Sequence, residues 1–182
     1  MIKFLMRIMI AVVIGAVLLS AAAEVYLKYK GTEVSVGPMG IVFLYEQSFI
    51  GDSYVYSDME MPNGWRMNRL VTFNTSYFLV KAIFGRPIED SVMIDVNGDG
   101  KVELMTTLKG EKDLLFKGII PKDAIICGGR NKLPPERLAA CESADEYYQN
   151  IVKKHQFKEK IEAVRGAADQ NNQEEKKNEI HL

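Results

Sequence analysis

The sequence predicts a mainly β fold of the α+β class: a small β-sheet domain with an N-terminal hydrophobic helix and a C-terminal amphipathic helix. Short runs of alternating apolar and polar residues, bounded by glycine and proline, recur between residues 24 and 127. Such alternation is typical of half-buried strands. The first 23 residues are nearly all apolar, and apolar residues recur at helical spacing after residue 143.

The N-terminal segment, residues 1–23, reads as a signal peptide or a membrane anchor. It carries Lys3 and Arg7, then an apolar run, then small residues in which Ala21 and Ala23 frame a cleavage site before Glu24. This arrangement is typical of a secretory signal peptide. Counted from residue 4, the run also reaches the roughly 20 residues that a membrane span needs. Both alternatives place the rest of the chain outside the cytoplasm.

The β-rich domain is expected over residues 24–127. Residues 24–38 form a stalk or a first strand, and strands are expected over 41–50, 53–61, 65–73, 91–95 and 101–108. Residues 77–84, "YFLVKAIF", fit a short helix or a buried strand, because period alone cannot assign a short apolar run. Two further short strands are expected at 113–120, "DLLFKGII", and 124–127, "AIIC".

A helical extension is expected over residues 128–168. Ser143 and Glu146 form a capping-box pattern that predicts a helix start. Apolar residues then recur at helical spacing through Ala168, and we expect this face to pack back on the sheet. Residues 169–182 are too polar to bury a core and are predicted to be a disordered tail.

The two cysteines, Cys127 and Cys141, indicate a disulfide if the domain is exported, because oxidising compartments favour pairing of an even count. Free thiols are the alternative. A bridge would constrain the unfolded chain by roughly 3 kcal/mol on the loop-entropy model. The spacing differs from the C-x-x-C of redox and zinc motifs.

The stretch "DVNGDGKVE", residues 95–103, predicts a calcium loop. Hard divalent cations take six to eight oxygen ligands, and alternating acidic or amide side chains converge most readily on one point. Gly100 permits the bend after the third of these side chains. The predicted ligands are Asp95, Asn97, Asp99, the backbone carbonyl of Lys101, and Glu103.

This pattern, D-x-N-G-D-G-x-x-E between two strands, resembles the calcium loops of FG-GAP repeats in integrin-type β-propellers and related exported proteins. The resemblance implies Ca²⁺ binding by the residues just named. It covers about 15 residues, and a propeller needs several blades where this chain has one loop, so neither the propeller fold nor an adhesive role carries over. The loop is also EF-hand-like, but an EF-hand needs a bidentate Glu at position 12, where this chain has Thr106.

A metal-free hairpin is the alternative interpretation of residues 95–103. Asn-Gly and Asp-Gly are strong hairpin signals because they tolerate positive φ. That interpretation does not require Asp95 and Glu103 at the two ends of the loop. Without a cation, the three carboxylates would repel each other.

A serine hydrolase is a second function class. Gly51-Asp52-Ser53 after an apolar run resembles the first block of SGNH hydrolases, which would make Ser53 a nucleophile. That family takes its base from an Asp-x-x-His near the C-terminus, and neither His155 nor His181 follows such an Asp. His155 is instead expected on the solvated side of the final helix, and His181 in the tail.

The net charge of −1, from 23 basic and 24 acidic residues, gives no basic field of the kind that nucleic-acid binding uses. The sequence therefore predicts an exported or membrane-anchored, non-enzymatic protein with one structural calcium site. It would be a scaffold or interaction component of an envelope or extracellular assembly. The expected partner is an envelope or membrane-complex protein, with the membrane itself contacted if residues 1–23 are retained.

Overall fold

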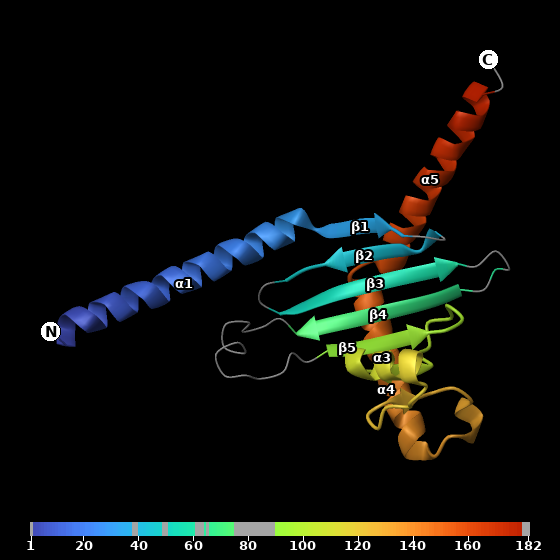
Figure 1. Ribbon diagram of the computed structural model, residues 1–182, viewed down its shortest axis with the longest axis horizontal. Coiled ribbons are helices and arrows are strands. Elements are labelled where there is room, and N and C mark those ends of the chain that lie inside the picture. The colour runs from blue at the N-terminus through green and yellow to red at the C-terminus, as the bar shows by residue number, and fades with distance from the viewer. Residues whose placement is uncertain are drawn as a thin grey trace.

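The computed structural model describes residues 2–37, 40–48, 51–60, 64, 66–74 and 90–179. Seven antiparallel strands form one sheet in the order β1-β2-β3-β4-β5-β6-β7, with each strand beside its neighbour in sequence. A long N-terminal helix projects from one end of the sheet, and two C-terminal helices cross one face (Figure 1). The predicted α+β class with its two flanking helical segments is confirmed.

The elements follow one another without crossover connections. Their bounds are α1 Ile2–Lys30, β1 Thr32–Val36, β2 Val42–Glu46, β3 Asp52–Glu60, β4 Arg66–Asn74, β5 Asp90–Asp95, β6 Leu104–Thr106, α3 Leu108–Lys117, β7 Ile125–Ile126, the 3₁₀ turn η2 Arg130–Lys132, α4 Pro135–Lys154 and α5 Phe157–Glu179.

The core forms where one face of the sheet meets α4 and α5. The strand registers place Leu44 opposite Tyr56, Tyr56 opposite Leu70, and Leu70 opposite Met93, so these side chains share a face. All four are fully buried. They pack against residues of α4 and α5, among them Ala144, Tyr148, Ile151, Val152, Phe157 and Ile161. The predicted return of the C-terminal apolar face onto the sheet is therefore observed.

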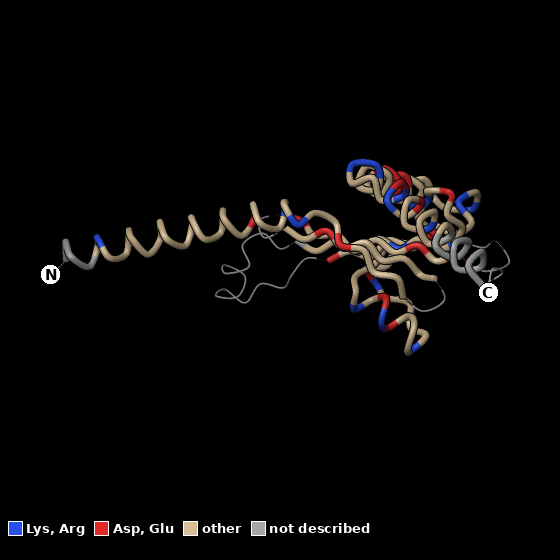
Figure 2. Tube along the Cα trace, turned by 90° about the horizontal axis from the view of Figure 1, so that it is seen from above, with Lys and Arg blue, Asp and Glu red and all other residues tan. Residues whose placement is uncertain are grey.

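Helix α3 replaces the strand predicted at residues 113–120. The Thr107 hydroxyl accepts a hydrogen bond from the Gly110 amide at 3.1 Å and caps its start. Gly118, with φ of 64°, ends it in the left-handed conformation. Figure 2 shows the sheet edge-on, with this short helix on the face opposite α4 and α5. Glu111 of α3 forms a bidentate pair with Arg69, which alternates with the core-facing Leu70.

The C-terminal helical segment differs from the prediction in where it starts and in its continuity. Helix α4 begins at Pro135 rather than Ser143, since proline with its fixed φ suits the first helical turn. The single predicted helix breaks at His155 and Gln156, where Gln156 has φ of 52°. His155 is not on the solvated side. Its ring lies 4.5 Å from the Tyr54 ring, and its Nδ1 is 2.6 Å from Glu46 Oε1.

Two predicted boundaries also fall inside helices. Helix α1 continues through the boundary between residues 23 and 24 to Lys30, so residues 24–30 are helix rather than strand. Helix α5 continues through residue 169 to Glu179. Glu, Lys and Gln are good helix formers, so a polar segment can continue an existing helix. The segment 77–84, predicted as a helix or a buried strand, and His181, predicted in the tail, lie outside the described residues.

Candidate functional site

The predicted calcium loop joins β5 to β6 at one end of the sheet. Asp95 is the last residue of β5, and β6 begins at Leu104. Gly98 and Gly100 have φ of 74° and 88°, the left-handed region that side-chain-bearing residues rarely adopt. The two glycines therefore allow the tight path that gathers the predicted ligands into one short loop.

Asp95, Asn97 and Asp99 organise the backbone of this loop. Both carboxylate oxygens of Asp95, which is fully buried, accept backbone hydrogen bonds, from Gly98 at 2.7 Å and from Gly100 at 2.9 Å. Asn97 Oδ1 accepts from the Asp99 amide at 3.1 Å, and Asp99 Oδ1 accepts from the Lys101 amide at 2.8 Å. Each side chain thus holds the amide of a residue two to five positions later.

Glu103 closes the loop from its far end. Its Oε2 accepts a hydrogen bond from the Val96 amide at 2.7 Å, and its own amide donates to the Ile94 carbonyl at 2.9 Å. The side chains at the first and last predicted ligand positions therefore both turn inward on the loop. Lys101 is exposed and lies between the two ends.

The surroundings of Asp95 and Glu103 disfavour the charged form of both carboxylates. Burial raises the pKa of Asp95, the Gly100 and Gly98 amides oppose this rise, and the nearby charge of Asp99 adds to it. Burial likewise raises the pKa of Glu103, with the charges of Asp95 and Asp99 adding to the rise. A bound cation would relieve this mutual repulsion.

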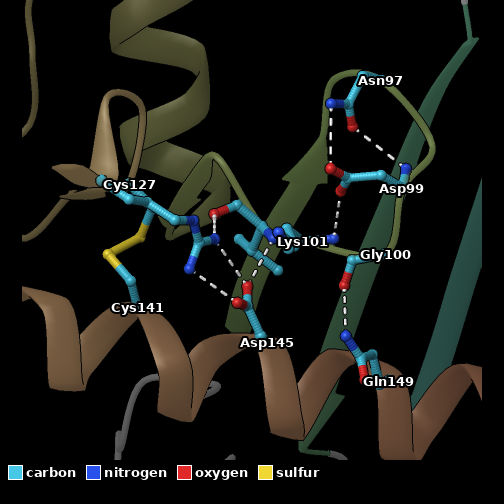
Figure 3. Close-up of polar contacts among 10 residues, drawn as sticks. Asn97, Asp99, Gly100, Lys101, Cys127, Cys141, Asp145 and Gln149 are labelled. Atoms are coloured by element: carbon cyan, nitrogen blue, oxygen red, sulfur yellow. Dashed lines mark hydrogen bonds and ion pairs between the residues drawn. A yellow bond between two sulfur atoms is a disulfide. The ribbon is translucent and has the colours of Figure 1, made fainter.

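Three residues of the C-terminal segment, which we call the C-terminal strap, hold the loop against α4 (Figure 3). They are Arg130, Asp145 and Gln149. Asp145 Oδ1 accepts a hydrogen bond from the Val102 amide at 2.7 Å, and Arg130 donates to the Val102 carbonyl at 2.9 Å. Arg130 and Asp145 are themselves joined at 2.7 and 2.9 Å. Gln149 donates to the Gly100 carbonyl at 2.8 Å. Both polar backbone groups of the buried Val102 are therefore satisfied by one ion pair.

The predicted disulfide forms at the base of this strap. Cys127 and Cys141 are bonded, with their Cα atoms 5.7 Å apart, and Cys141 lies on α4. The bridge closes the segment that contains Arg130, which fixes where the guanidinium can reach. The Cys127 amide also donates to the Glu103 carbonyl at 2.8 Å.

The chain matches no known protein family, no curated protein and no solved structure.

The loop has the ligand atoms that a Ca²⁺ site needs, but it does not hold them in the arrangement of a formed site. The donor chemistry suits calcium, because each carboxylate oxygen keeps a lone pair after accepting one amide. The arrangement differs from a formed metal centre: among the described residues, no three Asp, Glu, His or Cys side chains are gathered as metal ligands. The loop oxygens face their own backbone amides, so binding would require the side chains to turn toward a shared point.

Ser53, the predicted nucleophile of the hydrolase alternative, lies in β3. Its hydroxyl accepts from the Ser48 amide at 2.9 Å and donates to the Ser48 carbonyl at 3.2 Å. Its neighbour Tyr54 faces the side of the sheet on which His155 packs. Since adjacent residues of a strand face opposite sides, Ser53 and His155 lie on opposite faces of the sheet.

Sequence reasoning did not identify Arg130, Asp145 and Gln149 as parts of this site. They come from residues 130–149, well after the loop, and each resembles an ordinary charged or polar surface residue in the sequence. The one available signal was the cysteine pair, which marks residues 127–141 as a closed segment near the end of the sheet domain.

Proposed function

We propose that this protein is a membrane-anchored, non-enzymatic component of an extracytoplasmic assembly. The observation that carries the proposal is α1. Residues 6–30 form a helix long and apolar enough to cross a membrane, and its most apolar stretch is not buried against the rest of the described chain. A core helix of a soluble domain would be mostly covered.

The disulfide supports placement of the sheet domain outside the cytoplasm. Disulfides persist in oxidising compartments and are rare in the cytosol. The basic residues Lys3 and Arg7 precede the apolar run, and cationic residues favour the cytoplasmic side of a span. Both features favour the same orientation, with the N-terminus inside and the sheet domain outside.

The test of anchoring is the mass of the protein purified from membranes. A retained anchor gives a chain that starts at Met1 and stays in the membrane pellet after alkaline extraction. A chain that starts at Glu24 and is released into the soluble fraction would show instead that residues 1–23 are a cleaved signal peptide. A variant with Ala23 replaced by a bulky residue, which blocks cleavage, should behave identically to the unmodified protein if the anchor is normally retained.

An exposed apolar patch on and after α3 supports the interaction role. Leu115, Phe116, Ile119 and Ile120 are 56–79% exposed. The Gly118 cap fixes their positions, since the amides of Gly118 and Ile119 bond back to α3 at 3.0 and 3.3 Å. Exposed apolar clusters of this kind mark interaction sites.

The charges around the patch indicate its partner. Lys109, Lys112, Lys117 and Lys122 are exposed beside it. They outnumber the two neighbouring acids, Asp113, which pairs with Lys117 at 2.7 Å, and Asp123, so the net positive charge would make two copies of the patch repel each other. Figure 2 shows α3 to one side of the sheet, whereas α1 projects along it. With α1 along the normal of a bilayer, the patch faces in a direction parallel to the membrane plane. The partner that fits is a protein anchored in the same membrane, with an apolar surface rimmed by carboxylates.

A photo-crosslinking amino acid at position 116 tests this contact in native membranes. The matched control is the same amino acid at Tyr147, which is 43% exposed on α4, across the sheet. We expect one crosslinked product from position 116 and none from position 147. The product from position 116 should disappear when Lys112 and Lys117 are changed to Glu. A product that forms equally at both positions, or that survives charge reversal, contradicts the proposed partner chemistry.

We further propose that the 95–103 loop binds one structural Ca²⁺ through Asp95, Asn97, Asp99, Glu103 and the Lys101 carbonyl. The support is the donor chemistry and the raised pKa of Asp95 and of Glu103, to which burial contributes most and neighbouring carboxylate charge adds. The cation would fix a loop already tied to α4. When calcium exceeds its dissociation constant a hundredfold, the folded state gains about 2.7 kcal/mol.

Calorimetric titration of chelator-treated protein with calcium tests this site. We expect heat of binding and a raised melting temperature, both lost in the Asp95→Ala/Asp99→Ala variant and kept when Glu142, an exposed acid on α4, is changed to Ala. Absence of binding at millimolar calcium would show that the loop is a metal-free connection, held by its own hydrogen bonds.

A further inference from the structure

A polar cavity of about 350 Å³ lies where α1 meets the sheet. Glu24, Leu27 and Lys28 of α1 form one wall, the facing ends of β2 and β3 form the second, and the end of α4 forms the third. Its volume falls in the range of small-molecule pockets. It is separate from the 95–103 loop and the α3 patch.

The position of this cavity along α1 places it in the headgroup layer of a bilayer. Residues 4–23 form the apolar run, and 20 helical residues span about 30 Å, the thickness of the hydrocarbon core. Glu24 is then the first residue beyond the hydrocarbon, and Lys28 follows one helical turn later. Headgroups occupy roughly 5–7 Å on each side of the core. The α1 wall of the cavity therefore lies at their depth.

The lining charges are of both signs. Glu46 and Asp52 contribute carboxylates from the strand ends, beside Glu24 of α1. Lys28 and Lys154 contribute ammonium groups from two different helices, and Lys28 Nζ lies 3.4 Å from Glu24 Oε1 on α1. Glu46 is held by His155 at 2.6 Å, and Glu24 by the Ser48 hydroxyl at 3.0 Å, so these acids have defined positions. A ligand that matches this lining carries a cation and an anion together.

We propose that the cavity binds the headgroup of a zwitterionic phospholipid that bears a primary ammonium, as in phosphatidylethanolamine. The lysines bind the phosphate, and the carboxylates accept hydrogen bonds from the ammonium. This proposal rests on retention of α1 as the membrane anchor, because only then does the cavity lie at headgroup depth.

The cavity should distinguish ethanolamine from choline. A primary ammonium donates three hydrogen bonds, whereas a trimethylammonium donates none and would leave the carboxylates unpaired. The rings of Tyr54 and His155 also line the cavity, but their centroids are only 4.5 Å apart and their planes are tilted by 45°, so they do not form a cage around a quaternary ammonium. An anionic headgroup without an ammonium would place an extra negative charge beside the acids.

Native mass spectrometry of the full chain in mild detergent tests the proposal. Phosphatidylethanolamine, phosphatidylcholine and phosphatidylglycerol with the same acyl chains are titrated in turn. We expect one ethanolamine lipid to be retained at least about tenfold more tightly than the others, the effect of one charge-assisted hydrogen bond. Asp52→Asn, a change at an exposed carboxylate that leaves the core intact, should remove that preference. Lys154→Gln should weaken retention of all phospholipids at the site.

Asp123→Asn, at an exposed acid outside the cavity, is the matched control and should leave retention unchanged. Equal retention of the ethanolamine and choline lipids, or an unchanged preference in Asp52→Asn, overturns the proposal. If free phosphoethanolamine displaces the lipid at equal concentration, the cavity recognises the zwitterionic group as proposed. The ligand would then be a soluble zwitterion, and the proposal of a lipid ligand would be overturned. The same spectra report the first residue of the chain, so a failure of the anchor is distinguished from a failure of the headgroup site.

Discussion

The ion pair between Arg130 and Asp145 provides the sharpest test of how the loop is held. Asp145 Oδ1 accepts from the Val102 amide at 2.7 Å, while both of its oxygens receive the Arg130 guanidinium. Replacing Asp145 with Ala removes the acceptor from a fully buried backbone group. It also leaves a guanidinium that is only 21% exposed without its carboxylate.

The expected loss follows from these contacts. A hydrogen bond to a charged group contributes about 1.5–3 kcal/mol, and removing one partner of a buried ion pair costs about 3–5 kcal/mol. Because Asp145 is 15% exposed, water screens part of the charge, so we expect the lower figure, about 3 kcal/mol. For a chain of this size, that lowers the melting temperature by roughly 6–12 °C. Asp145→Asn, which keeps an oxygen acceptor, should lose about half as much.

The assay is urea unfolding of the full chain in mild detergent, followed by circular dichroism. Glu142→Ala, at an exposed acid on the same helix, is the control and should change the free energy of unfolding by less than about 0.5 kcal/mol. A double-mutant cycle with Arg130→Met should give a coupling above about 1 kcal/mol. A coupling near zero would refute the argument, because the pair would then act as an ordinary surface salt bridge.

Three further predictions concern the rest of the domain. Replacing Cys127 and Cys141 with Ala should lower the free energy of unfolding by roughly 3 kcal/mol, as measured by the same unfolding assay, and an unchanged value would mean that the bridge does not constrain the unfolded chain. Burial and the charge of Asp52 raise the pKa of Tyr54 in the folded protein to about 12. The contribution of neutral Tyr54 to the free energy of unfolding is therefore complete below about pH 10 and is lost as the pH rises toward 12. Unfolding at stepped alkaline pH should show this decline, with a shallower slope in Tyr54→Phe. Phe157→Ala should cost about 3–5 kcal/mol, since this buried ring stacks on Tyr56 at 5.2 Å, whereas Leu115→Ala at the exposed patch should cost little.

Most of the sheet could be predicted from the sequence because one of its faces is buried and the other is not. That asymmetry gives alternation, as in β3, where Tyr54 and Tyr56 face the helices and Ser53 and Val55 face the other way. Such a pattern needs only local information.

Helix α3 could not be predicted by the same means. Its segment contains a short apolar run, Leu114 to Phe116, that fits a strand as well as a helix. The deciding features are the Thr107 cap and the bidentate pair of Glu111 with Arg69, 42 residues away in the chain. Only the first of these is visible locally.

The candidate site also has one part that could be predicted from the sequence and one part that could not. The alternating oxygens at 95, 97 and 99 share one loop, so the sequence identifies them directly. The strap comes from distant residues with ordinary surface chemistry. The hydrogen bonds of the loop are also invisible in the sequence, because the same letters allow the side chains to face a cation or the backbone.

The junction between α1 and the sheet determines how the domain would respond to a pulling force. Gly31 is the only residue between the end of α1 at Lys30 and the start of β1 at Thr32, and Figure 1 shows the strand continuing nearly along the helix axis. A pull on α1 would act along β1, at right angles to the hydrogen bonds of its antiparallel ladder with β2. Its five residue pairs would then be sheared together rather than peeled apart one by one. If α1 is retained as the proposed membrane anchor, a domain attached in this way can transmit tension between the bilayer and a partner on its far side without first separating β1 from β2.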